Sequence, residues 1–102
     1  MGLPACLSVT LQINIFKEKK RCELNEDHIQ VLIREKYRGH VLTTNQVLAM
    51  DYHGTAITLQ VLSMIDDSKT NNPPYGLITN ESRMTVIPDP DNKYLIWVTQ
   101  HS

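Results

Sequence analysis

The stretch Leu7-Ser-Val-Thr-Leu-Gln-Ile-Asn-Ile15 decides the fold class, because apolar and polar side chains alternate along all of it. A period of two places every second side chain on the same face of a β-strand. The apolar residues of this stretch therefore face a core. The alternating polar residues, Ser8, Thr10, Gln12 and Asn14, face the other way. This pattern predicts a half-buried strand.

A helix is expected next, after a charged connection. Asn25 is a suitable N-cap, and Glu26 and Asp27 place negative charge in the first turn, where the helix dipole favours it. Cations near the end and Gly39, which tolerates a left-handed conformation, predict a stop close to residue 38. The helix is thus expected over residues 26–38. Apolar residues recur within it at helical spacing: Ile29, Leu32, Ile33 and Tyr37.

The remainder of the chain is typical of strands separated by polar turns. His53-Gly54 is a candidate two-residue hairpin turn, because glycine supplies the positive φ that tight hairpins need. The strands are expected over residues 46–52, 55–65, 76–79, 84–87 and 94–99. The order β-α-β-β-β-β-β predicts an α+β fold in which one helix covers a mostly antiparallel sheet. The expected core between them contains Leu11, Ile13, Leu32, Ile33, Leu59 and Val61.

Composition limits the class of protein. A chain of 102 residues, with 41% hydrophobic and 21% charged residues, fits one globular domain spanning residues 1–102. A net charge of -1 gives no global attraction to nucleic acid. Neither a membrane-spanning stretch nor a signal peptide is evident, so we expect a cytoplasmic protein with Cys6 and Cys22 as reduced thiols.

The sequence offers no residue set for catalysis. Its four histidines lack partners at metal-ligand spacing, and its four glycines are too scattered to form a phosphate-binding loop. Asp66-Asp67 and Asp89-Pro90-Asp91 lack the glycine and distal glutamate of a calcium loop. We therefore expect a non-enzymatic chain with neither cofactor nor metal.

The cations are unevenly distributed. Seven of the ten Lys and Arg residues lie between positions 17 and 38: Lys17, Lys19, Lys20, Arg21, Arg34, Lys36 and Arg38. A one-sided basic patch on a nearly neutral protein attracts an acidic partner. The alternative is that these charges only keep a loop solvated.

Several segments, taken in order, resemble the N-terminal domain of the vesicle-fusion ATPase N-ethylmaleimide-sensitive factor. They are Leu7–Phe16, the lysine-rich connection, the helix ending Lys36-Tyr37-Arg38, Val41–Gln46, Asp51–Thr55 and Tyr75–Thr79. The resemblance extends to about Pro88, and the tail with Tyr94–Trp97 departs from it. It implies that this chain corresponds to the second, α+β subdomain of that N-terminal domain.

The resemblance also implies a function. In that family the N-terminal domains of a homohexameric AAA ATPase grip SNAP adaptors, and the machine then disassembles SNARE complexes at membranes. Nucleotide and magnesium belong to the ATPase domains, and a double-psi barrel subdomain precedes the α+β subdomain. In that family, basic residues at and near the cleft between the subdomains are implicated in adaptor binding, among them the lysines after the first strand. The resemblance matches these to Lys19 and Lys20 or, one residue shifted, to Lys17 and Lys19. We therefore expect the lysine-rich connection to supply the adaptor-binding residues Lys17, Lys19, Lys20 and Arg21. On its own this fragment is expected to be a monomer. In the parent protein it is expected to be peripheral to membranes through its partners.

Two other functions remain open at this point. A related AAA ATPase that handles ubiquitylated proteins would use the same fold, although Asp51–Thr55 is more similar to the fusion factor. A nucleic-acid-binding domain could use the basic residues 17–38. Against it stand the pI of about 6.4 and the scarcity of aromatic residues near the patch, Phe16 and Tyr37 alone.

Overall fold

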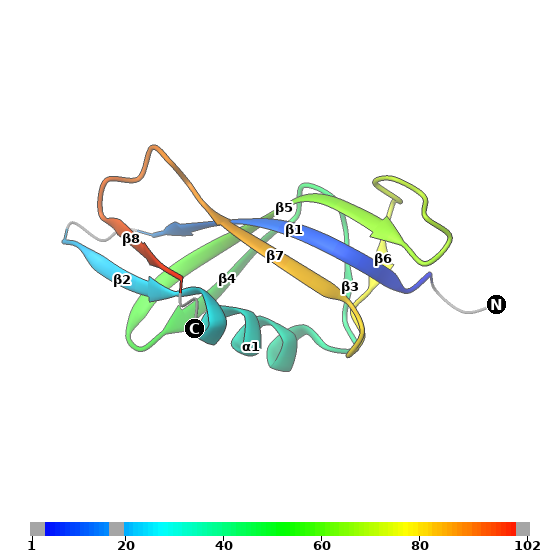
Figure 1. The fold of residues 1–102 in the computed structure, drawn as a ribbon, viewed down its shortest axis with the longest axis horizontal. Coiled ribbons are helices and arrows are strands. Elements are labelled where there is room, and N and C mark those ends of the chain that lie inside the picture. Colours follow the sequence, from blue (N-terminus) through cyan, green and yellow to red (C-terminus); the bar gives the residue numbers. More distant parts are fainter. Residues whose placement is uncertain (1–3, 17–19, 100–102) are drawn as a thin grey trace.

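A computed structural model describes residues 4–16 and 20–99 of the chain. Figure 1 shows one helix lying beneath a long, twisted arrangement of strands. In chain order the elements are β1 (Cys6–Ile15), β2 (Cys22–Asn25), α1 (Glu26–Tyr37), β3 (Val41–Leu42), β4 (Val47–Tyr52), β5 (Thr55–Asp66), β6 (Gly76–Leu77), β7 (Arg83–Pro88) and β8 (Leu95–Val98). Within the described residues, α1 is neither long nor apolar enough to cross a membrane.

The main sheet has four strands in the order β4-β5-β1-β7. β5 pairs antiparallel with both β4 and β1, whereas β7 runs parallel to β1. Two small sheets complete the fold, β2 parallel to β8 and β3 antiparallel to β6. The expected α+β class is confirmed, and the pairing is mixed because two of the five strand pairs are parallel.

Local signals set the ends of α1 and of the β4–β5 hairpin as predicted. The Asn25 side chain accepts a hydrogen bond from the His28 amide at 3.2 Å, which caps the first turn. Gly39, with φ +83°, follows the C-cap Arg38 and ends the helix in the left-handed region. His53 and Gly54 have φ of 50° and 87°, the pair of positive values that a type I′ hairpin requires.

The core lies between α1 and the inner face of the sheet. Leu11, Ile13, Leu59, Val61 and Ile33 are fully buried there, as expected. Leu32 is the exception, because it is only partly buried and packs against the border of the core. Ile29 and Ile33 instead turn fully inward from the helix.

The predicted element order was incomplete. The structure adds β2 directly before the helix and β3 directly after it, so the order is β-β-α-β-β-β-β-β-β. Both added strands are short, with four and two residues, and each pairs with a strand far along the chain. Local periodicity cannot identify strands of this length, which explains why they were missed.

Candidate functional site

The basic connection, residues 17–21, joins the end of β1 to the start of β2. Lys20 and Arg21 are both exposed. Lys17 and Lys19, the other predicted adaptor-binding residues, lie outside the described residues. The structure therefore leaves the two described cations of the predicted site accessible to a partner.

Both ends of this connection are held firmly. At the β1 end, the Phe16 amide donates to the Ala56 carbonyl at 2.9 Å. At the β2 end, the Cys22 amide donates to the Tyr94 carbonyl at 2.8 Å, and β2 then pairs with β8. Anchored ends lower the conformational entropy that a connection loses when it binds a partner.

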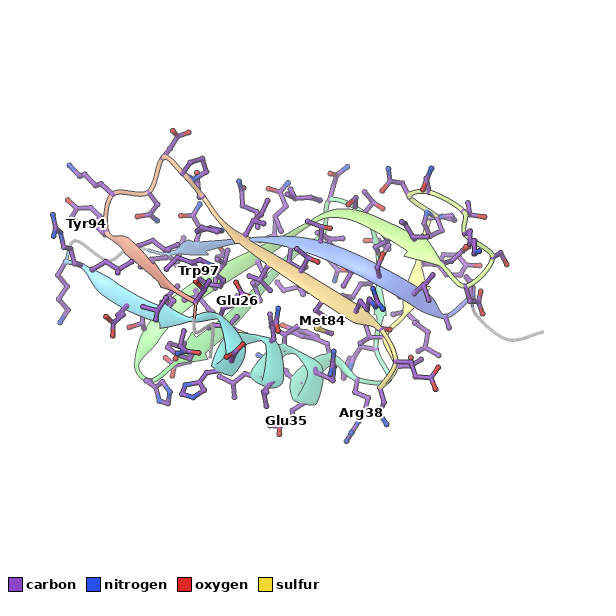
Figure 2. All side chains as sticks on the ribbon, in the orientation of Figure 1. Glu26, Glu35, Arg38, Met84, Tyr94 and Trp97 are labelled. Atoms are coloured by element: carbon purple, nitrogen blue, oxygen red, sulfur yellow. The ribbon has the colours of Figure 1, made fainter. Side chains whose placement is uncertain are left out.

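β8 is itself attached to the start of the helix. The Trp97 indole Nε1 donates to Glu26 Oε2 at 3.2 Å, and Figure 2 shows these two side chains side by side below β8. The tail that departs from the resembled family is therefore a structural strand of this domain. It supports the basic connection through β2.

A polar hollow of about 330 Å³ lies at this same end of the molecule, lined by Asn14, Asp89, Asp91, Asn92, Lys93 and Tyr94. Asn14 Nδ2 donates to Asp89 Oδ2 at 2.6 Å, and Asn92 Nδ2 donates to Asn14 Oδ1. The turn between β7 and β8 is thus bonded to the end of β1. One sign of it is visible in the sequence, the polar turn Asp89-Pro-Asp-Asn92, whose acids lack a calcium-loop pattern.

The hollow changes the electrostatic character of the predicted site. Because the Cys22 amide bonds to the Tyr94 carbonyl, the start of β2 adjoins a turn that carries Asp89 and Asp91 as well as Lys93. The described cations Lys20 and Arg21 directly precede this start of β2, so the positive charge there has carboxylates in its neighbourhood.

The helix cations form a second, separate group. Arg34 donates to the Ser82 carbonyl at 3.0 Å, and Arg38 donates to Asn80 Oδ1 at 3.2 Å. Lys36 Nζ donates to the Ala49 carbonyl at 3.3 Å. A helical rise of about 1.5 Å per residue places all three more than ~10 Å along the axis from the N-terminal end of α1. The sequence stretch 17–38 is therefore not one basic surface.

One thiol, that of Cys6, is buried in the core. Burial, and then the nearby Asp66 carboxylate, raises the pKa of the Cys6 thiol to about 11, so the thiol stays protonated at neutral pH. Cys22 is also a free thiol and is partly exposed. No group of three or more His, Cys, Asp or Glu side chains suited to a metal ion occurs in residues 4–16 and 20–99.

Comparisons with known proteins show a fold and no family. No family model matches the chain, and no curated protein matches its sequence. Ph1500 of Pyrococcus horikoshii, a homohexameric protein centred on a 12-bladed β-propeller, matches in its solution structure with a TM-score of 0.56 and 18% identity. The match covers 100% of this chain and 56% of Ph1500, so this chain spans little more than half of that protein.

The isolated N-terminal domain of Ph1500 matches as a complete unit. Its solution structure gives a TM-score of 0.56 at 19% identity, and the match covers 88% of this chain and 100% of that domain. At this identity the likeness is one of fold alone. The chain thus has the fold of an N-terminal domain of an archaeal protein, and no match to the vesicle-fusion factor is found among these.

Proposed function

We propose that this chain is a non-catalytic protein-binding domain that engages an adaptor protein through the basic connection, residues 17–21. The observation that carries the proposal is the exposure of Lys20 and Arg21 on a connection with both ends hydrogen-bonded to the body of the domain. Exposed cations on an anchored loop attract acidic partners at little cost in ordering.

In its finer form the proposal identifies the partner as a SNAP-type adaptor and the parent protein as a vesicle-fusion AAA ATPase. The sequence resemblance to the N-terminal domain of that ATPase supports it. The fold likeness to the N-terminal domain of Ph1500, a homohexamer, is compatible with a domain displayed six times around a ring. Six weak contacts of this kind would combine by avidity.

Charge reversal of the described cations tests the proposal. Lys20→Glu with Arg21→Glu should leave the fold intact, because both side chains are exposed. It should reduce capture of a purified SNAP adaptor on beads carrying many copies of the domain. Wild-type capture should also weaken with salt, since exposed charges are screened over about 8 Å at physiological ionic strength.

A matched control makes the same change of net charge elsewhere. Lys69→Glu with Arg83→Glu alters two exposed cations near the other end of β1 and should leave capture unchanged. Circular dichroism establishes that both double variants are folded. Equal capture by wild type and the Lys20→Glu, Arg21→Glu variant would reject the basic connection as the binding surface.

A further inference from the structure

The outer edge of β4 is unpaired within the described part of the chain, because β4 ends the main sheet. Tyr52 and Thr55 are the pair that closes the two-residue hairpin, and the Val61 amide donates to the Gln46 carbonyl. Hydrogen-bonded pairs alternate along an antiparallel ladder, so the even-numbered residues of β4 are the ones that bond to β5. Backbone groups of Val47, Ala49 and Asp51 therefore point away from the sheet. Such a row is a template for an additional strand.

One side chain covers part of this edge. Lys36, an exposed residue of α1, extends its Nζ to the Ala49 carbonyl at 3.3 Å, and the same ammonium lies 5.6 Å from the centre of the Tyr37 ring. An exposed lysine is mobile and well hydrated, so it leaves the carbonyl at little cost. The edge is therefore protected by a group that can be displaced.

We propose that the β4 edge binds an extended segment of another protein as an added strand, with a carboxylate of that segment facing Lys36. The added strand bonds to the outward amides and carbonyls of Val47, Ala49 and Asp51. Lys36 then exchanges the Ala49 carbonyl for the incoming carboxylate. A hydrogen bond from the ammonium to a neutral carbonyl is replaced by one to a carboxylate, in which both partners are charged and attract each other more strongly.

Charge decides between an acidic segment and a second copy of this chain. If two β4 edges paired antiparallel about Ala49, two Lys36 ammonium groups would meet near the symmetry axis. Like charges placed opposite each other across strands destabilise the pairing, and lysine at a sheet edge is a known protection against self-association. The edge therefore favours a strand from a different protein that supplies the opposite charge.

A shallow hollow beside the edge offers a place for an apolar side chain of the same segment. It measures about 280 Å³ and lies between α1 and the end of β4, lined by His28, Val31, Leu32 and His53. Val31 is 56% exposed, so part of its apolar surface is open to such a side chain. Side chains alternate along a strand, so an added strand can direct every second residue toward this side of the sheet.

This surface is distinct from the basic connection, which lies between β1 and β2. The inference goes beyond the proposed function and does not depend on it. Lys20→Glu with Arg21→Glu should leave peptide binding at β4 unchanged, and variants of Lys36 should leave adaptor capture unchanged. Failure of one proposal is thus distinguishable from failure of the other.

The test is an NMR titration of the ¹⁵N-labelled domain with acetyl-Val-Thr-Glu-Thr-Val-amide, in which Glu and both Val side chains share one face of a strand, and with its counterpart that has Lys in place of Glu. We expect amide shifts confined to β4 and the end of α1, and about two- to fivefold tighter binding of the Glu peptide. Lys36→Glu should reverse this preference. Equal binding of the two peptides, or shifts centred elsewhere, would overturn the proposal.

Ala49→Pro separates strand pairing from simple charge attraction. The Ala49 amide points away from β5, so proline removes an outward donor and spares the ladder. Binding of the Glu peptide should fall about tenfold. Should this variant not fold, N-methylation of alternate peptide residues gives the same information, because only the set that faces β4 should abolish binding. Undiminished binding in both cases, or concentration-dependent self-association of the domain without peptide, would contradict the assignment.

Discussion

β7 and β4 form opposite edges of the main sheet, and side chains of α1 reach both of them. At β7 the helix supplies two donors, Gln30 to the Met84 carbonyl at 3.1 Å and Arg34 to the Ser82 carbonyl at 3.0 Å. At β4, within the described part of the chain, it supplies one donor, the flexible side chain of Lys36, at 3.3 Å. Figure 2 places Met84 on β7 directly above the helix, where the two elements meet.

This difference shows how a single helix divides a small sheet into a closed side and an open side. Covering an edge with a helix removes it as a template for pairing, whereas a lone lysine only discourages pairing. The β7 edge is therefore covered near Met84. β4 is the edge whose outward amides and carbonyls are free to pair with another strand.

Shortening a helix side chain that is fully buried should have the largest effect on the closed side. Ile33 is 0% exposed, so Ile33→Ala should lower the free energy of unfolding by about 2–5 kcal/mol. Leu32→Ala, at a partly buried position, should cost only about 1–2 kcal/mol. Urea unfolding measures both, and equal costs would mean that the helix does not face the sheet as described.

Alkaline pH should lower the free energy of unfolding through ionisation of the Cys6 thiol. Cys6 adjoins the closed side, because its carbonyl accepts a 2.6 Å hydrogen bond from Ser82 Oγ just before β7. The pKa of Cys6 is raised from 9.0 to about 11 in the folded state. The unfolded chain therefore loses this proton first, and stability present below pH 9 is lost as the pH rises toward 11. At about 1.36 kcal/mol per pKa unit the loss is roughly 2–3 kcal/mol.

The control for this prediction is Cys6→Ala, since other groups also titrate at alkaline pH. Urea unfolding at each pH from about 8 to about 11 covers the thiol pKa values of both the unfolded and the folded chain. Over this range the free energy of unfolding of Cys6→Ala should fall less steeply than that of wild type. Parallel curves for the two proteins would show that the Cys6 thiol ionises equally easily in the folded and unfolded chain.

The smallest effects should distinguish the two edges directly. Gln30→Met keeps the length of the side chain but removes the donor to Met84, which should cost about 1 kcal/mol. Lys36→Met removes an exposed donor and should cost about 0.5 kcal/mol or less. Thermal or urea unfolding of the pair gives the comparison. A larger loss for Lys36→Met would reverse the assignment of open and closed edges.

The sequence predicted the features that depend on neighbouring residues. Alternation from Val9 to Ile15, the Asn25 cap, the Gly39 stop and the His53-Gly54 turn all act within a few residues, and the structure confirms each. Leu7 was wrongly expected to face the core, because a register shift between Cys6 and Ser8 leaves it exposed and buries Cys6 instead. Leu32 was assigned wrongly to the core because helical spacing defines a stripe and not its border.

Long-range pairing could not be predicted in the same way. β7 runs parallel to β1 although it lies about seventy residues later, and nothing local specifies its partner. The hollow at Asn14 and Asp89 arises from this same pairing, which brings the turn after β7 to the end of β1. The predicted cations Lys20 and Arg21 are indeed exposed, whereas their role in binding stays a prediction.

Amide hydrogen exchange along β4 shows whether this edge of the sheet is open. Val47, Ala49 and Asp51 should exchange fast and Leu48, Met50 and Tyr52 slowly, because only the second group donates to β5. Addition of the Glu peptide should slow the first group alone. Slow exchange at all six amides in dilute protein without peptide would show that the edge is already covered, and would contradict the account.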